Sequence, residues 1–480
     1  MRNRQIITLL LIASLILLSA CTSSTVEEQK VPEPQQVEES SETEKVKDET
    51  TDIVIVGGGG AGMAAAIEAT EGGAKVILVE KLPFLGGTTI LASTAYNAGG
   101  SSVQMAMEKP YTADDFYAKI VKGKTDENGS IRRLADMSGE TADWLIKMGG
   151  DLSKVINGSQ HITSDGSAFG VMIASVLINK LNELGIDYRT NAKATEIIME
   201  GDKAVGVKIE SPDGNYNIMA DAVILATGGF ASNPEMVAEY TPQWAGYPST
   251  ASVGATGDGI KMAMAVGAAI GNMDSASPQT VAYDTGKGAV SLTNVRYNGA
   301  ILVNEEAVRF VNELADTASL GAAIKAQTNG HAYLVFDQTS VDNAALMQEY
   351  KDRGYFIEAN TIEELAAKIN LDASTLTKTI ETYQGYFDAG EDKEFGRKDS
   401  MFSRIDKAPY YASLISPASQ TTNGGVMIDD GARALREDGT SIPGLYIGGE
   451  TANQEGPGLT VAFNIGRLAA KTALADMKLK

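Results

Sequence analysis

The stretch Asp52–Glu80, DIVIVGGGGAGMAAAIEATEGGAKVILVE, decides the fold of this chain. It opens with an apolar, β-branched run at 53–56, which is typical of a buried strand. A glycine turn follows, then a helical pattern from Met63 to about Glu71 and a second strand-like run at 75–79. A strand, a glycine turn, a helix and a second strand in this order predict the first unit of a Rossmann-like α/β fold.

The glycine turn carries the spacing G-x-G-x-x-G at Gly57, Gly59 and Gly62. In this pattern the first glycine allows a tight turn, the second lets the backbone approach a pyrophosphate, and the third lets the helix pack against the strand. Ala61 lies at the same helix N-terminus, whose free N–H groups favour phosphates. Glu80 follows the second strand and can accept hydrogen bonds from a ribose. We therefore predict a dinucleotide site, the alternative being an ordinary glycine-rich turn.

The length and the charge of the chain limit its function. With 480 residues, 43% of them hydrophobic, the chain is too long for one compact core and is expected to form two domains with appendages. The formal net charge is −22, so no basic surface large enough to neutralise nucleic-acid phosphates is expected. We therefore predict that the chain binds no nucleic acid.

The N-terminal residues are typical of a secretory signal. Arg2 and Arg4 precede a mostly apolar run at 5–18, which is too short for a comfortable membrane span. The sequence Leu-Ser-Ala-Cys, ending at Cys21, resembles the lipobox of bacterial lipoproteins, in which the cysteine is lipidated. We expect a lipoprotein signal peptide at 1–20 and an extracytoplasmic protein held to the cell membrane through Cys21. A plain signal peptide or an uncleaved anchor is the alternative.

The segment 21–50 has a composition of its own. From 22 to 50 it carries nine acidic residues and three lysines, and it has no aromatic residue. Such a segment cannot bury enough apolar surface to offset its chain entropy, so we expect a disordered tether. Cys21 is the single cysteine of the chain, which excludes an intramolecular disulfide and a cysteine-ligated metal; no metal site is expected.

The segment after Glu80 reads Lys81-Leu82-Pro83-Phe84-Leu85-Gly86-Gly87-Thr88-Thr89. It resembles the flavin-binding segment of the fumarate reductase and succinate dehydrogenase flavoprotein family, in which a Gly-Gly pair brings the backbone close to the flavin. The resemblance is to the soluble single-chain branch, which includes flavocytochrome fumarate reductases and urocanate reductases. It extends from Asp52 to the C-terminus and implies FAD, bound without a covalent link.

Further motifs along the chain resemble the same family and imply cofactor contacts. Ala194 would meet the adenine, and Asp258 would contact the flavin. The alternative for Asp258 is the N-cap of a helix that begins near Ile260, and the two roles can coexist. The closing helix, from Thr460 to about Met477, would point its N-terminus at the flavin and stabilise negative charge there. Beyond the glycine motif and Glu80, the implied cofactor-binding residues are Lys81, Gly86, Gly87, Thr88, Thr89, Ala194, Thr227, Gly228, Asp258, Thr421, Glu450, Gly458 and Leu459.

The resemblance also implies a domain plan. From about Asn272 to Thr421 the pattern changes to mixed helices and strands without dinucleotide signals, which matches the capping domain of the family. We therefore expect a Rossmann-like FAD-binding domain formed by 51–271 and 422–480. An α+β capping domain at 272–421 would be inserted between these two parts.

Two arginines of the expected capping domain are catalytic candidates by resemblance. Arg309 lies in the motif Arg-Phe-Val-Asn-Glu, where the family has its proton donor, and Arg296 falls where the family has a proton-relay arginine. A reduced flavin would deliver hydride from N5 to one carbon of an activated C=C bond, and an acid would protonate the neighbouring carbon. The alternative for both arginines is a structural role in ion pairs.

The positions that would set the substrate differ from the family pattern. Ser277 stands in place of one histidine, Gln420 in place of a histidine pair, and Asn453 near the place of an arginine. A substrate with two carboxylates would need at least one more buried cation to offset desolvation. The neutral replacements favour a less charged, small unsaturated substrate such as an enoate or an enone.

The electron donor is expected to be a separate molecule. One dinucleotide fingerprint serves the flavin, and the chain has no Cys-x-x-Cys-His motif for a covalent haem. We therefore expect a separate electron-transfer protein or a quinone-linked donor. The leading hypothesis is a lipid-anchored FAD-dependent reductase of an activated C=C bond. Gly456-Pro457-Gly458 also resembles ketosteroid dehydrogenases, so an FAD-dependent desaturation of a ketone-type substrate stays open, as does a non-catalytic ligand-binding lipoprotein.

Overall fold

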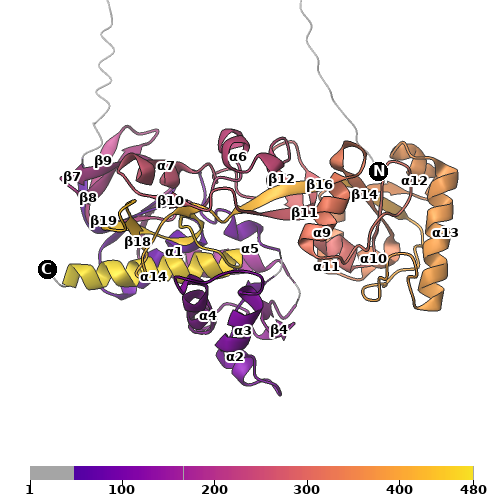
Figure 1. The fold of residues 1–480 in the computed structure, drawn as a ribbon, viewed down its shortest axis with the longest axis horizontal. Coiled ribbons are helices and arrows are strands. Elements are labelled where there is room, and N and C mark those ends of the chain that lie inside the picture. Colours follow the sequence, from indigo (N-terminus) through magenta and orange to yellow (C-terminus); the bar gives the residue numbers. More distant parts are fainter. Residues whose placement is uncertain (1–47, 94, 166, 479–480) are drawn as a thin grey trace, which may run out of the picture. The chain divides into compact units, whose positions relative to one another are not determined.

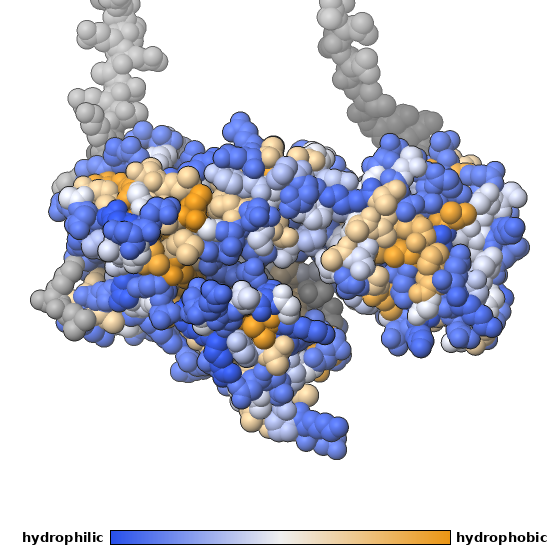
Figure 2. Space-filling model, viewed as in Figure 1, coloured by the Kyte–Doolittle hydropathy of each residue, from blue (hydrophilic) through white to orange (hydrophobic). Residues whose placement is uncertain are grey.

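A computed structural model of the chain describes residues 48–93, 95–165 and 167–478. The expected signal peptide, Cys21 and most of the expected tether therefore lie outside the described residues. Within the described part, no helix combines the length and the apolar character needed to cross a membrane. On the face shown in Figure 2, hydrophilic residues predominate and apolar residues form small separate groups, as is ordinary for a protein surface.

The main sheet has eight strands in the described residues. These are β1 (Glu49–Val56), β2 (Val76–Val79), β6 (Asp187–Arg189), β7 (Lys193–Glu200), β8 (Lys203–Glu210), β9 (Tyr216–Leu225), β18 (Arg433–Leu435) and β19 (Ser441–Ile447). The order is β18-β19-β9-β1-β2-β6, with β8 on β9 and β7 on β8. β1 pairs in parallel with both β2 and β9. The predicted Rossmann-like α/β fold is therefore confirmed.

Two long helices pack together beside this sheet. α1 (Gly60–Glu71) joins β1 to β2, and α14 (Gly458–Lys478) closes the chain. Figure 1 shows them side by side. A Cβ atom on Gly466 of α14 would lie 2.3 Å from the carbonyl oxygen of Ala61, so the two backbones approach more closely than side chains would allow. The C-terminal helix is thus held against the glycine turn.

The folded part begins earlier than the sequence predicted. The tether was expected to run to Thr50, but β1 begins at Glu49. The Glu49 carboxylate accepts two hydrogen bonds from Arg189, at 2.9 and 2.8 Å. Asp48 accepts a hydrogen bond from the backbone N–H of Asn217. Hydrogen bonds to Arg189 and Asn217, which lie far along the chain, therefore hold the end of the expected tether in the sheet.

A second sheet carries the expected capping domain. Its strands are β11 (Ala276–Asp284), β12 (Ala289–Ser291), β13 (Ile301–Val303), β14 (Ala332–Asp337), β15 (Ile357–Ala359) and β16 (Tyr410–Thr422). The order is β12-β11-β16-β14-β13, with β15 on β16. Its helices are α8 (Thr293–Tyr297), α9 (Thr317–Lys325), α10 (Gln338–Asp342), α11 (Ala345–Asp352), α12 (Ile362–Lys368) and α13 (Ala373–Ala389). Figure 1 shows α9 to α13 grouped around β14.

Two antiparallel strands connect this second sheet to the rest of the chain. The chain enters it along β11 and leaves along β16, with Ser277 opposite Thr421. The pairing shifts by a bulge between Ser277 and Pro278. The second sheet has apolar clusters of its own, one around Phe336 and another around Ile380, as an α+β domain requires. From the start of β11 to the end of β16, this part of the chain spans Ala276 to Thr422.

The remaining described elements complete the first domain. These are α2 (Ser102–Met105), α3 (Ala113–Ile120), α4 (Ser130–Lys147), α5 (Phe169–Glu183), α6 (Pro234–Tyr240), α7 (Asp258–Ala265), β3 (Tyr96–Asn97), β4 (Lys154–Ile156), β5 (Gln160–Ile162), β10 (Ile270–Gly271) and β17 (Gly425–Val426). β3, β5 and β4 form a small sheet that contains His161. The ring of His161 is buried against Ser101 and the Leu152 carbonyl, which indicates a structural role.

Candidate active site

A cavity of about 760 Å³ runs along the glycine turn and reaches the capping domain. This volume is within the range of about 300–1,000 Å³ that ligand sites occupy. Most of the predicted site residues line it: Gly57, Gly59, Ala61, Glu80, Lys81, Gly87, Thr88, Thr89, Ala194, Thr227, Gly228, Asp258, Arg296, Gln420, Thr421, Glu450, Gly458 and Leu459. Gly62, Gly86, Ser277, Arg309 and Asn453 are not among the lining residues.

The glycine turn fits the phosphate-bearing part of a dinucleotide. A Cβ atom on Gly87 would lie 3.0 Å from the Cα atom of Gly59, so two backbone segments without side chains meet here. Gly86 pairs with Gly59 in an isolated bridge behind them. A Cβ atom on Gly62 would lie 1.8 Å from the carbonyl oxygen of Gly57. Gly62 and Gly86 therefore shape the turn from behind, while Gly59 and Gly87 face the cavity.

Glu80 lies at the end of β2, where a ribose would be expected. Its carboxylate accepts hydrogen bonds from the backbone N–H of Gly58 at 2.7 Å and of Leu82 at 2.8 Å. These contacts hold the side chain at the cavity wall. Its remaining acceptor positions suit ribose hydroxyl groups.

Lys81 and Asp258 form an ion pair on the cavity wall, with 2.7 Å between Nζ and Oδ2. Burial raises the pKa of Asp258, but the hydrogen bond and the charge of Lys81 outweigh this effect and lower it. The sequence predicted Asp258 as a helix cap. The structure instead gives the cap position to Gly257, in the left-handed region with φ of 75°, and α7 begins at Asp258. The acid still lies in the first helical turn, where the helix dipole favours it.

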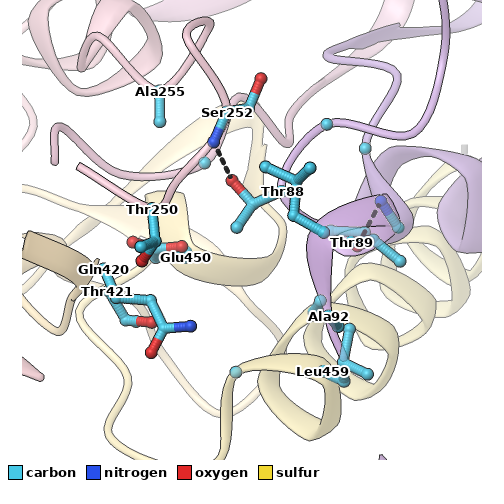
Figure 3. A pocket seen from close by; sticks show the side chains of 18 of the residues that line it. Thr88, Thr89, Ala92, Thr250, Ser252, Ala255, Gln420, Thr421, Glu450 and Leu459 are labelled. Carbon is cyan, nitrogen blue, oxygen red and sulfur yellow. Dashed lines mark hydrogen bonds between the residues drawn. The ribbon is translucent and has the colours of Figure 1, made fainter. Parts of the chain in front are cut away.

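Glu450 lies on the cavity wall and is held by Thr422. Its Oε1 accepts hydrogen bonds from the backbone N–H and the hydroxyl of Thr422, at 2.8 and 3.2 Å. Burial raises the pKa of Glu450 to about 7, although the two hydrogen bonds act in the opposite direction. Figure 3 shows Glu450 near Thr250, Gln420 and Thr421. This carboxyl group can therefore gain or lose a proton near neutral pH.

Thr88 and Thr89 join the flavin-binding segment to neighbouring segments. The Thr88 hydroxyl accepts a hydrogen bond from the backbone N–H of Ser252 at 3.1 Å, and Thr89 accepts one from Gly60 at 3.2 Å (Figure 3). These contacts position both side chains at the cavity.

Arg296 supplies a guanidinium on the capping side of the cavity. The residue is 4% exposed. Its Nη1 donates to the carbonyl oxygen of Glu313 at 2.6 Å, and its Nη2 donates to the phenol oxygen of Tyr297 at 3.3 Å. Its buried Nε has no hydrogen-bond partner in the described part of the chain. Burial lowers the pKa of Arg296, and the charge of Arg397 lowers it further.

Arg309 does not reach this cavity. Its side chain is 2% exposed and is paired with Glu313 and Asp392, at 2.9 and 2.8 Å. Its guanidinium also lies over the rings of Tyr383 and Phe395. Burial alone would lower the pKa of Arg309, but the two carboxylates outweigh burial and raise it above its ordinary value. The structure thus places the predicted proton donor, Arg309, in a buried ion-pair network outside the cavity lining.

Two of the three predicted substrate residues also lie away from the cavity. Ser277 is exposed on β11, next to the bulge, and its hydroxyl is 3.4 Å from the amide nitrogen of Asn423. Asn453 accepts a hydrogen bond from Asn272 at 2.9 Å. Gln420 lines the cavity as predicted. The bulge in β11 turns Pro278 and its successors, rather than Ser277, toward the cavity.

Several residues that line the cavity from the capping domain were not among the predicted site residues. The cavity is also lined by Pro278, Gln279, Thr280, Ser291, Thr293, Asn294, Tyr297 and Thr317. Tyr297 directly follows the predicted Arg296, and this adjacency was the one local signal for it. Pro278, Gln279 and Thr280 could not be found without the pairing of β11 with β16. No group of His, Cys, Asp and Glu side chains suited to a metal ion occurs in the described ranges.

A Rossmann-like domain whose glycine turns face a capping domain across one cavity defines a flavoprotein oxidoreductase. The model of the family described as FAD binding domain matches residues 52–459, and the chain belongs to this family. It is 35% identical over 430 residues to the fumarate reductase (cytochrome) of Shewanella frigidimarina, a match that covers 85% of this chain and 74% of the relative.

Two further matches cover most of this chain. The chain is 32% identical over 446 residues to the urocanate reductase of Eggerthella lenta, covering 86% of this chain and 72% of the relative. A solved flavocytochrome c3 fumarate reductase in its open conformation matches with a TM-score of 0.79 at 30% identity, over 90% of this chain and 79% of that one. The cofactor is therefore FAD, and the chain is an FAD-dependent oxidoreductase acting on CH–CH or C=C bonds.

Proposed function

We propose that this protein reduces the activated C=C bond of an enoate or an enone that carries at most one negative charge. The supporting observation is the charge of the residues that line the cavity from the capping domain, which we call the capping wall. Among its described lining residues, Arg296 is the one cation, and its Nε has no partner. The other two lining cations, Lys81 and Lys193, belong to the FAD-binding domain, and Lys81 is paired with Asp258.

The relatives support the reaction class. Their names describe reductases of fumarate and urocanate, which are both unsaturated acids. The cavity residues around Gly59, Gly87 and Glu80 would hold FAD, which would supply hydride chemistry when reduced. Arg296 would bind the carboxylate or carbonyl group that activates the C=C bond and would stabilise the negative charge that develops on it. A second carboxylate would meet neutral Gln279, Thr293 and Gln420 side chains, which cannot offset its desolvation.

In this proposal Arg309 has a structural role and does not contact the substrate. It neutralises Glu313, whose backbone carbonyl accepts the Nη1 hydrogen bond of Arg296. Arg397 donates a further hydrogen bond to the Glu313 carboxylate at 3.1 Å. Arg309 therefore supports the position of Arg296 from behind, at a distance from the substrate.

The electron donor and the cellular location complete the proposal. The lipobox-like sequence at Cys21 supports an extracytoplasmic lipoprotein on the cell membrane. A relative named fumarate reductase (cytochrome) supports electron supply through a separate cytochrome or quinone-linked donor. A membrane anchor would keep the protein beside such a donor.

Purified flavin-loaded protein tests the reaction class. With chemically reduced viologen as donor, we expect reduction of monocarboxylate enoates, such as acrylate and cinnamate, or of enones, in preference to fumarate. The reverse reaction is measured with an oxidising dye and the saturated compounds. Faster turnover in the reverse direction would favour a dehydrogenase of ketone-type substrates, and a colourless protein without flavin would contradict both enzymatic roles.

A further inference from the structure

We propose that Tyr297 is the proton donor of the reaction, and that Arg296 holds the phenol oxygen and the negative charge left on it. The proposal rests on the proposed function, because it concerns the carbon next to the one that receives hydride. Neither sequence motifs nor the relatives' names pointed to this tyrosine. It follows from which side chains of the capping domain line the cavity.

The chemistry of the capping wall leaves few donors. Apart from Arg296 and Tyr297, its described lining residues are a proline and side chains with alcohol or amide groups. Such alcohols and amides do not ionise in the range that general acid catalysis uses, whereas tyrosine is a known general acid. A phenol ordinarily ionises near pH 10 and a guanidinium above about 12, so a phenol releases its proton more readily.

The geometry around the phenol suits this role. The Arg296 Nη2 donates to the Tyr297 oxygen at 3.3 Å, and the Arg296 Cζ lies 4.7 Å from the centre of the Tyr297 ring. A positive charge in this position stabilises a phenolate. Arg296 is itself fixed by the Glu313 carbonyl at 2.6 Å. The proton donor therefore has a rigid cationic neighbour that needs no rearrangement when the charge forms.

Because Tyr297 is exposed, solvent can replace the proton that it donates. Tyr297 is 44% exposed, while Arg296 beside it is 4% exposed. A residue that lines the cavity and is also exposed can regain its proton from solvent. Arg309, buried between two carboxylates, has no comparable access.

The step balances in atoms and charge. Hydride addition to one carbon breaks the π bond and leaves its electron pair on the neighbouring carbon. That pair forms a C–H bond with the phenol proton of Tyr297 while the O–H bond breaks. The phenolate is held by Arg296 and then takes a proton from water. The net change is the addition of one hydride and one proton across the C=C bond.

Tyr297→Phe removes the phenol proton together with the oxygen that accepts the Arg296 Nη2 hydrogen bond. With reduced viologen and the fastest enoate of the panel, we expect kcat to fall by about 10²- to 10⁴-fold, the usual contribution of a general acid. Tyr283→Phe is the matched control, because Tyr283 belongs to β11 but does not line the cavity; its kcat should stay at the wild-type value. Flavin absorption and thermal unfolding report that each variant is folded and loaded.

A second readout does not depend on turnover. Tetranitromethane nitrates accessible tyrosines, and mass spectrometry locates the modified residues. In oxidised protein, bound 3-phenylpropionate, or the saturated product of whichever panel compound is fastest, should protect Tyr297 several-fold. Tyrosines that do not line the cavity serve as the internal reference.

The outcomes separate the two proposals. Wild-type kcat in Tyr297→Phe, or equal nitration of Tyr297 with and without the saturated compound, would overturn the role of Tyr297 and leave the proposed function standing. A wild-type protein that reduces no member of the panel would overturn both. A large loss of kcat together with protection of Tyr297 is the result that supports this donor.

Discussion

At the scale of single residues, Glu450 predicts a pH dependence of stability. Burial raises its pKa from 4.5 to about 7. The folded protein therefore keeps a proton that the unfolded chain has already released, and the free energy of unfolding falls as the pH rises from about 4.5 to about 7. A pKa difference of one between the folded and unfolded states corresponds to about 1.4 kcal/mol, so the loss amounts to about 3 kcal/mol at most.

Glu450→Gln should remove this part of the pH dependence, because an amide cannot ionise but can still accept the Thr422 hydrogen bonds. The measurement is urea unfolding of the variant and the wild type across this pH window. Glu200→Gln, at an exposed carboxyl, is the control and should follow the wild type. An unchanged slope in Glu450→Gln would show that the folded protein does not keep a proton on this carboxyl group.

Substitutions of Arg309 distinguish a structural role of this residue from a catalytic one. Arg309→Met would leave Glu313 and Asp392 buried without this cation, and such a loss costs about 3–5 kcal/mol. Arg309→Lys keeps the charge and should retain most of the wild-type kcat. Arg132→Ala, which removes the exposed ion pairs of Arg132 with Asp114 and Asp136, should cost less than about 1 kcal/mol. Chemical unfolding and viologen-linked turnover measure both effects. A folded Arg309→Lys protein with kcat reduced by several orders of magnitude would restore Arg309 as the proton donor.

At the scale of elements, the glycine turn predicts which substitutions remove the cofactor. A Cβ atom on Gly62 would lie 1.8 Å from the carbonyl oxygen of Gly57, so Gly62→Ala must push α1 away from β1. We expect this variant to purify without the yellow colour of bound flavin. Gly385→Ala, within α13 and with no atom near its added methyl group, should keep the flavin and be slightly more stable. Full flavin content in Gly62→Ala would contradict the close packing at this turn.

The elements also show how much of the site could be predicted from the sequence. The β1-α1-β2 unit was predicted because its signals are local: a buried strand, three spaced glycines and an acid at the next strand end. The capping wall depends on the pairing of β11 with β16 and on a bulge between Ser277 and Pro278, which no periodic pattern reveals. Arg309 was misplaced for a similar reason, since its partner Asp392 lies far along the chain.

At the scale of the whole molecule, the proposed anchor predicts two separable effects of one substitution. Cys21→Ser would remove the sulfur that lipidation requires and leave the described fold unchanged. In a bacterial host that processes lipoproteins, the wild type should sediment with membranes and the variant should appear in the soluble extracytoplasmic fraction. The purified proteins should have equal kcat with reduced viologen, because that donor diffuses freely.

Turnover with membrane vesicles, supplied with a substrate that reduces their quinones, provides the decisive comparison for this anchor. A tether concentrates the protein near a membrane-bound donor, and this effective concentration is lost when the link is cut. The variant should therefore lose turnover with vesicles by about tenfold or more, while its viologen activity is unchanged. Equal activity of both proteins with vesicles would mean that the donor is a soluble carrier. Sedimentation of the variant with membranes would show that the hydrophobic run at 5–18, rather than Cys21, anchors the chain.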